Sequence, residues 1–138
     1  MSVKVLIFAY RKPGLSLSTF REIYEAHVDL VKRITGDDFP LSHRRTYIAR
    51  TEAASPLEGS DSTRNATTPA TVLIGKQSDF DFDATAELTF ADQAAMGAFM
   101  AKISDPDAAA QIAADEERFL DRSALSVSMV GDVVETTK

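Results

Sequence analysis

The sequence predicts an α+β fold in which one antiparallel sheet carries helices on one face. The chain has 138 residues, of which 44% are hydrophobic, and this suits a single core. Apolar residues recur at every second position in some segments and at helical spacing in others. These segments follow one another in the order strand, helix, strand, strand, helices, strand, which points to one mixed domain.

The first two elements are a strand and a long helix. In residues 3–10 the odd and the even positions, which face opposite sides of a strand, are both mostly apolar. This is typical of a strand that is covered on both sides. An Arg-Lys-Pro-Gly turn signal follows. Ser16 or Thr19 can cap the next helix, and Gly36 closes it. Thr19 with Glu22 also fits a capping box.

The middle of the chain is less regular. Residues 43–50 form the second predicted strand. Residues 51–70 are rich in small and polar residues without periodicity and exceed the usual length of a connection. We expect a flexible loop there, either a flap or an insertion, within one domain over residues 1–138. Residues 72–74 are a short apolar run.

The last elements have clear signals. Residues 83–90 alternate between apolar and polar side chains, which predicts a strand with one polar face. A helix is expected over residues 91–103, and another begins at Pro106 with Asp105 as its cap. Alternation from Leu125 onward predicts a final strand.

This order is that of the ferredoxin-like β-α-β-β-α-β fold, with helices on one face of the sheet. The other face would lie bare, although the first strand is apolar on both sides. A second copy of the chain, packed sheet against sheet, is the simplest cover. The pattern therefore predicts a homodimer.

Composition excludes several classes of function. The chain has no cysteine, so disulfides, thiolate metal sites and cysteine nucleophiles are excluded. The net charge of −6 opposes nucleic-acid binding, although residues 1–50 hold 9 basic and 5 acidic side chains. No apolar run approaches the length of a membrane span. We expect a cytoplasmic protein.

Two histidines are the main candidates for chemistry. His27 lies in the apolar stripe of the first helix, so its ring points at the sheet, where it serves as an acid or base or as a structural core histidine. His43 shares a strand face with Arg45 and Tyr47, which suits an anionic ligand. The histidines are not spaced as a metal-binding pair, so no metal is expected.

Acidic residues offer further candidates. Asp83 and Glu87 share one strand face and either orient a histidine or remain solvated. Glu116 lies on the apolar side of the last helix, between Ile112 and Leu120, and could pair with a basic group. The expected catalytic residues are His27, His43 and Asp83. The expected substrate contacts are Tyr10, Tyr24, Arg45, Tyr47, Glu87 and Phe99.

Five segments resemble the EthD-domain family. The turn RKPGLS and the helix motif F-R-x-x-Y-E-x-H, which ends at His27, carry most of the likeness. The stretch FPLSHRRTYI follows. The later blocks DATAELTFAD and DEERFLDRS resemble the fungal branch of the family. One departure is that His27-Val28-Asp29 holds a single imidazole where the family often has a His or Pro pair.

The resemblance implies a dimeric α+β barrel with an apolar ligand pocket and no cofactor. It implies a decarboxylase, a lyase that acts on an aromatic polyketide carboxylic acid of the anthrone or atrochrysone carboxylic acid type. His27 would deliver the proton, with His43, Tyr47 and Asp83 as orienting or oxyanion-stabilising groups. The alternatives are a polyketide cyclase or dehydratase, a cofactor-free anthrone oxygenase, and a non-catalytic binder of an aromatic intermediate.

Overall fold

The computed structural model describes residues 2–138 and contains four strands, three α-helices and two short 3-10 helices. The elements in chain order are β1 (Val3–Ala9), α1 (Leu17–Thr35), η1 (Gly36–Asp38), β2 (Ser42–Tyr47), η2 (Gln77–Phe80), β3 (Ala84–Phe90), α2 (Gln93–Ser104), α3 (Pro106–Glu116) and β4 (Ser126–Met129).

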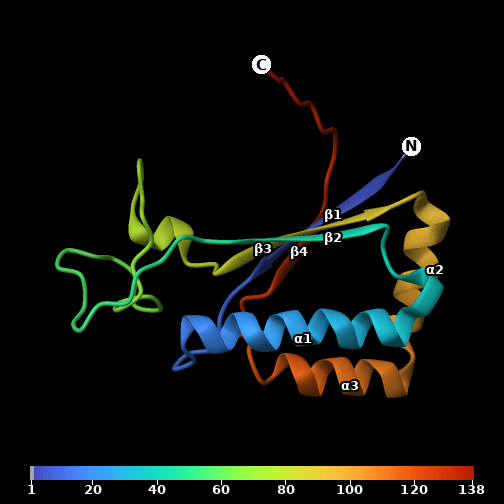
Figure 1. Cartoon of the computed structure of the whole chain (residues 1–138), viewed down its shortest axis with the longest axis horizontal. Coiled ribbons are helices and arrows are strands. Elements are labelled where there is room, and N and C mark those ends of the chain that lie inside the picture. The colour runs from blue at the N-terminus through green and yellow to red at the C-terminus, as the bar shows by residue number, and fades with distance from the viewer. Residues whose placement is uncertain (1) are drawn as a thin grey trace.

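The strands form one antiparallel sheet in the order β2-β3-β1-β4. Helices α1 and α3 run side by side under one face of the sheet, and α2 lies toward one end (Figure 1). This is the ferredoxin-like topology, and it confirms the predicted fold class. No helix within residues 2–138 is long and apolar enough to cross a membrane.

Alternation along β3 separates the two faces of the sheet. Ala84, Ala86, Leu88 and Phe90 are buried toward the helices, while the residues between them are partly exposed on the opposite face. In β1, Val5 pairs with Leu88 and contributes to the same apolar layer. The core therefore lies between the sheet and the helices, as the sequence predicts.

Helix ends follow local signals. The Ser16 hydroxyl accepts a hydrogen bond from the Thr19 backbone nitrogen at 3.2 Å, so Ser16 is the cap of α1 and the predicted box of Thr19 and Glu22 is not used. Gly36 ends the helix with φ of 54°, a left-handed value that favours glycine. Asp105 caps α3 from the position before Pro106.

Two strands are shorter than predicted and one apolar run is not a strand. β2 ends at Tyr47, because the following backbone turns to pair Arg50 with Ala70. β4 ends at Met129. Residues 72–74 form a bend in which Leu73 is 91% exposed. Apolar composition alone does not create a strand where no neighbouring strand can pair with it.

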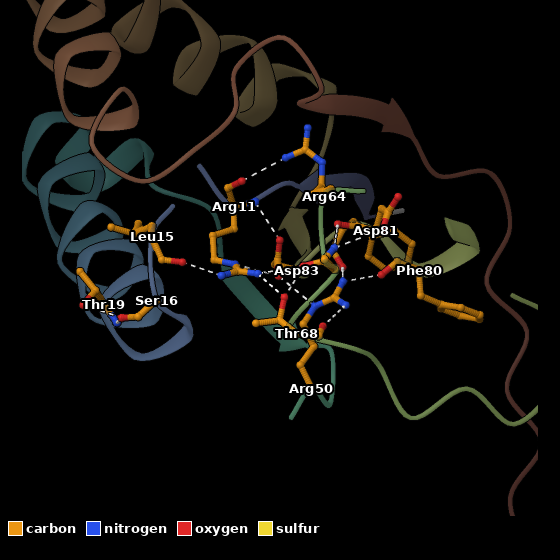
Figure 2. Close-up of polar contacts among 12 residues, drawn as sticks. Arg11, Leu15, Ser16, Thr19, Arg50, Arg64, Thr68, Phe80, Asp81 and Asp83 are labelled. Carbon is orange, nitrogen blue, oxygen red and sulfur yellow. Dashed lines mark hydrogen bonds and ion pairs between the residues drawn. The ribbon is translucent and has the colours of Figure 1, made fainter. Parts of the chain in front are cut away.

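A buried carboxylate joins three strands at one end of the sheet. Asp83 directly precedes β3, and its side chain accepts hydrogen bonds from the backbone nitrogen of Arg11 at 2.9 Å, from Arg11 Nε at 3.3 Å and from Arg50 Nε at 2.9 Å. Figure 2 shows the two guanidinium groups on either side of Asp83. Arg11 follows β1 and Arg50 follows β2, so Asp83 ties the ends of both strands to β3.

The same cluster anchors the long connection between β2 and β3. Arg11 donates to Asn65 Oδ1 at 2.8 Å and to the Thr68 hydroxyl at 2.8 Å. Asn65 is buried and also donates to the backbone oxygen of Asp81 at 3.2 Å. Arg64 pairs with Asp121 near the end of α3. The connection has little regular secondary structure, and polar side chains attach it to the sheet.

Replacing Asp83 with Asn should destabilise the fold strongly. The two buried guanidinium groups would lose their shared counter-charge, and breaking such a buried pair costs about 3–5 kcal/mol. The free energy of unfolding in urea measures this loss. Asp29→Asn, at an exposed position on α1, is the matched control and should change it by less than about 1 kcal/mol. Equal stability of the two variants would contradict this role of Asp83.

Candidate functional site

An apolar cavity of about 240 Å³ lies between the helix-facing side of the sheet and the three helices. Its walls include Val5 and Leu88 from the sheet, Phe99 from α2 and Ile112 from α3. Val127 of β4 lies at its rim and is largely exposed. A concave, mostly apolar site with a few convergent polar groups is the usual form of a small-molecule pocket.

Four polar side chains enter this cavity from three elements. Tyr24 and His27 come from α1, His43 from β2 and Glu116 from the end of α3. Tyr24 and His27 lie one helical turn apart, which places both on the buried face of α1. All other lining residues are apolar. The four polar groups therefore determine what chemistry a bound ligand meets.

His27 is held by a carboxylate from the neighbouring helix. Its Nδ1 lies 2.8 Å from Asp115 Oδ2, and its ring packs against Phe119 with centroids 5.0 Å apart. Burial opposes ionisation of Asp115, but hydrogen bonds from His27 and Arg118 outweigh it and lower the pKa of that carboxyl. A carboxylate can only accept, so His27 donates from Nδ1 and keeps Nε2 for a ligand.

His43 is held in the neutral state. Arg45 donates from Nη1 to His43 Nδ1 at 3.0 Å, so the ring proton lies on Nε2. Burial, and then the charge of Arg45, lower the pKa of His43 from 6.5 to about 4. The ring is therefore an uncharged hydrogen-bond donor toward the cavity at neutral pH.

The Arg45 side chain is held in place by the carboxylate of Glu25. Glu25 of α1 accepts from Arg45 Nε at 2.6 Å and Nη2 at 2.9 Å, and it also accepts from the Tyr47 hydroxyl at 2.6 Å. The Arg45 hydrogen bond is the main reason that the pKa of Glu25 is lowered. Arg45 and Tyr47 do not line the cavity, so they position His43 and brace β2 against α1.

Tyr24 supplies a second uncharged donor. It lines the cavity and is only 4% exposed. Burial raises the pKa of Tyr24 to about 12, so the hydroxyl keeps its proton at neutral pH. The ring packs against Phe119 with centroids 5.2 Å apart, which fixes its orientation.

The structure brings four of the predicted site residues together at the cavity. These are His27, His43, Tyr24 and Phe99. Helical phase is a local signal, and it predicts that His27 faces the core. The strand pattern only places His43 on one face with Arg45 and Tyr47, and the structure shows that His43 reaches the same cavity as His27.

Five predicted site residues do not line the cavity: Arg45 and Tyr47, which lie behind His43, and Tyr10, Asp83 and Glu87. Asp83 is bound by Arg11 and Arg50 at the end of the sheet, so it does not orient a histidine of the cavity. Tyr10 packs edge-on against Phe82 on the face opposite the cavity. Glu87 is on that opposite face by strand alternation and pairs with Lys4 at 3.2 Å.

The sequence did not indicate the contact of Asp115 with His27 or the cavity position of Glu116. The ion pair expected for Glu116 is present, with Arg122 Nε 3.5 Å from its Oε1. The helical spacing of Glu116 from Ile112 and Leu120 was the available signal for a cavity position. No local signal exists for the contact of Asp115, because its partner is 88 residues away in the chain.

Within residues 2–138 no three His, Asp or Glu side chains gather in a way that could hold a metal ion.

The pKa of His43 predicts a pH dependence of stability. The unfolded chain binds a proton on this ring below about pH 6.5, whereas the folded chain binds it only below about pH 4. The unfolded state therefore holds more protons in this window, and the free energy of unfolding should decrease as the pH falls through it. After allowance for partial exposure, the decrease is on the order of 2 kcal/mol.

Urea unfolding of wild type and His43→Gln at several pH values tests this effect, because glutamine does not titrate. The stability difference between the two proteins should shift in favour of the variant as the pH falls from about 6.5 to about 4. Parallel stability curves across that range would contradict the burial of a neutral His43.

Comparison with known proteins supports the fold and the family. A protein from Arabidopsis thaliana has a similar structure, with a TM-score of 0.57 and 15% identity over 98% of this chain and 99% of that chain. An ethyl tert-butyl ether d (EthD) family protein from Bacillus halodurans has a TM-score of 0.55 and 14% identity over 96% of this chain and 100% of that chain. A search of curated proteins finds no match. The family model for the EthD domain matches residues 12–123, well over half of the chain, so this protein belongs to the EthD-domain family.

Proposed function

We propose that this protein is a cofactor-independent decarboxylase of an aromatic carboxylic acid. The observation that carries the proposal is the convergence of the His27 and Asp115 pair with two uncharged donors, His43 and Tyr24, in an otherwise apolar cavity. Such an arrangement can stabilise an oxyanion and deliver a proton without a metal.

The reaction begins with the substrate carboxylate in the dry cavity, where its charge is poorly solvated. The bond between the carboxyl carbon and the ring or α-carbon breaks, and its electron pair moves into the adjacent carbonyl to form an enolate. His43 Nε2 and the Tyr24 hydroxyl donate hydrogen bonds to that oxygen. The His27 imidazolium, held by Asp115, then delivers its proton to carbon and recovers one from water.

The substrate class follows from the apolar walls and from the sequence. Aromatic and aliphatic side chains line the cavity, which suits a planar ring system. The blocks DATAELTFAD and DEERFLDRS resemble fungal members that tailor aromatic polyketides, which favours an anthrone or atrochrysone carboxylic acid type of substrate. A cavity of about 240 Å³ holds the reacting ring, and the rest of a larger substrate would extend past the exposed rim at Met100 and Val127.

Product mass tests this function. Pure protein is incubated with a β-keto aromatic acid in the presence of a chelator. Carbon dioxide should be released, and the mass of the product should equal that of the substrate minus carbon dioxide. Loss of water instead would indicate a cyclase or dehydratase, and oxygen consumption would indicate an anthrone oxygenase. Saturable binding without any product would indicate a non-catalytic binder. Each of these three results would overturn the decarboxylase proposal.

Replacing His27 with Gln should lower kcat by about 10²- to 10⁴-fold, because the proton donor to carbon is lost. Glutamine retains a polar group toward Asp115, and circular dichroism should confirm that the variant folds. Asp29→Asn, at an exposed position on the same helix, serves as the control and should keep wild-type turnover. Full turnover by a folded His27→Gln variant would remove His27 from the mechanism.

We also propose that the chain forms a homodimer through the sheet face opposite the helices. Leu6 and Phe8 of β1 lie on this face with Phe82, which stacks on Phe8 at 4.8 Å between centroids. The C-terminal segment and a yellow-green turn of the long connection both project on this side, away from α1 and α3 (Figure 1). Val134 in the C-terminal segment is 90% exposed. A second copy that packs on this face would cover these apolar groups.

Sedimentation should give a dimer at micromolar concentration, and Phe8→Glu should give a folded monomer, since a buried charge opposes association. Ser126→Glu, at an exposed position of β4 paired with Phe8, tests the same face from its edge and should weaken the dimer less. A wild-type monomer would contradict the interface.

A further inference from the structure

The cavity holds one acidic group that the mechanism above does not use. Glu116 is the last residue of α3, and Ile112 and Leu120, one turn before and after it, line the same cavity. Its side chain is 18% exposed. Its ion-pair partner is Arg122, whose Nε lies 3.5 Å from Glu116 Oε1 and whose own side chain is 44% exposed.

Neighbouring acids on α3 have opposite surroundings. Asp115 receives hydrogen bonds from His27 and Arg118, and both favour its charged form. Glu116 faces apolar walls instead, and burial raises the pKa of its carboxyl. Glu117 is 66% exposed and pairs with Arg122 in solvent. Three consecutive residues at the end of α3 therefore differ: Asp115 is hydrogen-bonded to His27, Glu116 faces the cavity, and Glu117, directly after the helix, is exposed to solvent.

The charged and titratable groups around Glu116 come from each element packed against it. They are Tyr24 and His27 on α1, Asp115 and Glu117 on α3, and Arg122 after α3. His27 and Arg122 favour the ionised form of Glu116, whereas burial and the two acids oppose it. A bound substrate would also exclude water from the cavity, which further disfavours the charge.

We infer that Glu116 is a second proton-carrying group of the cavity, which contacts the substrate as a neutral carboxylic acid and donates its proton to the oxygen that becomes the enolate. The inference rests on the proposed function and deepens it. As the bond to the carboxyl carbon breaks, the Glu116 proton moves to the carbonyl oxygen and gives an enol. Glu116 takes this proton back when the His27 imidazolium protonates carbon, so the charges balance at the end of the cycle.

This role also defines the ligand. The cavity presents hydrogen-bond donors from Glu116, His43 and Tyr24, and no lysine or arginine lines it directly. Its ligand should therefore carry several acceptor oxygens on a planar apolar frame, as a hydroxylated or keto-substituted aromatic acid does. An ionised Glu116 would repel the carboxylate of such an acid, because two like charges in a dry site interact strongly.

Binding of two probes tests Glu116 without any turnover. 1-Hydroxy-2-naphthoic acid carries the carboxylate, and 1-naphthol is its neutral counterpart. In wild type, raising the pH from mildly acidic to mildly alkaline should weaken binding of the acid about tenfold and leave binding of the naphthol unchanged. In a His27→Gln background, where the cavity imidazole no longer titrates, Glu116→Gln should make affinity for the acid independent of pH, because glutamine stays neutral. Glu117→Gln is the matched control and should behave as wild type.

Turnover gives the second readout. With a β-keto aromatic acid, Glu116→Gln should lower kcat by about 10²-fold with little rise in KM, since the amide can hold the substrate oxygen but cannot give it a proton. Absence of turnover in wild type would refute the decarboxylase and leave the binding test standing. A Glu116→Gln protein that keeps the wild-type pH dependence of acid binding, or the wild-type kcat, would overturn the role of Glu116.

Discussion

The carboxylate of Asp83 is the interaction on which most of this structure depends. It accepts hydrogen bonds from Arg11 and Arg50, so one buried charge joins the ends of β1 and β2 to the start of β3. Arg11 extends the same network to Asn65 and thereby attaches the long connection. Charged groups tolerate this burial because each has an opposite charge beside it and further hydrogen-bond partners. The sheet register behind the cavity is therefore set partly by electrostatics at its far end.

The cavity shows how one helix can give similar residues different tasks. Rotation by about 100° per residue separates Asp115, Glu116 and Glu117 around the axis of α3. Asp115 meets His27, Glu116 enters the cavity, and Glu117 reaches solvent. Burial raises the pKa of Glu116, whereas hydrogen bonds from His27 and Arg118 lower the pKa of Asp115. A catalytic site that needs both a fixed carboxylate and a neutral acid can thus be built from two adjacent residues.

The two histidines are tuned by different partners. His27 donates from Nδ1 to the Asp115 carboxylate, which fixes the tautomer and leaves Nε2 to the cavity. His43 is buried and accepts from Arg45, and both keep its ring neutral. The two rings therefore offer a ligand different hydrogen-bonding atoms. This division of roles is consistent with chemistry that needs neither a metal nor an organic cofactor.

Local patterns in the sequence determined the order of elements, the alternation of β3 and the inward direction of His27, because alternation and helical phase depend only on nearby residues. Only the tertiary structure decided which side chains bind one another. Asp83 shares a strand pattern with Glu87, yet one is bound by two arginines and the other lies on the opposite face. The contact of His27 with Asp115 joins residues 88 positions apart, and no local signal encodes such a distance. The first strand, apolar on both sides, indicated a covered outer face, whereas the four polar groups of the cavity were assembled only by the packing of α1, α3 and β2.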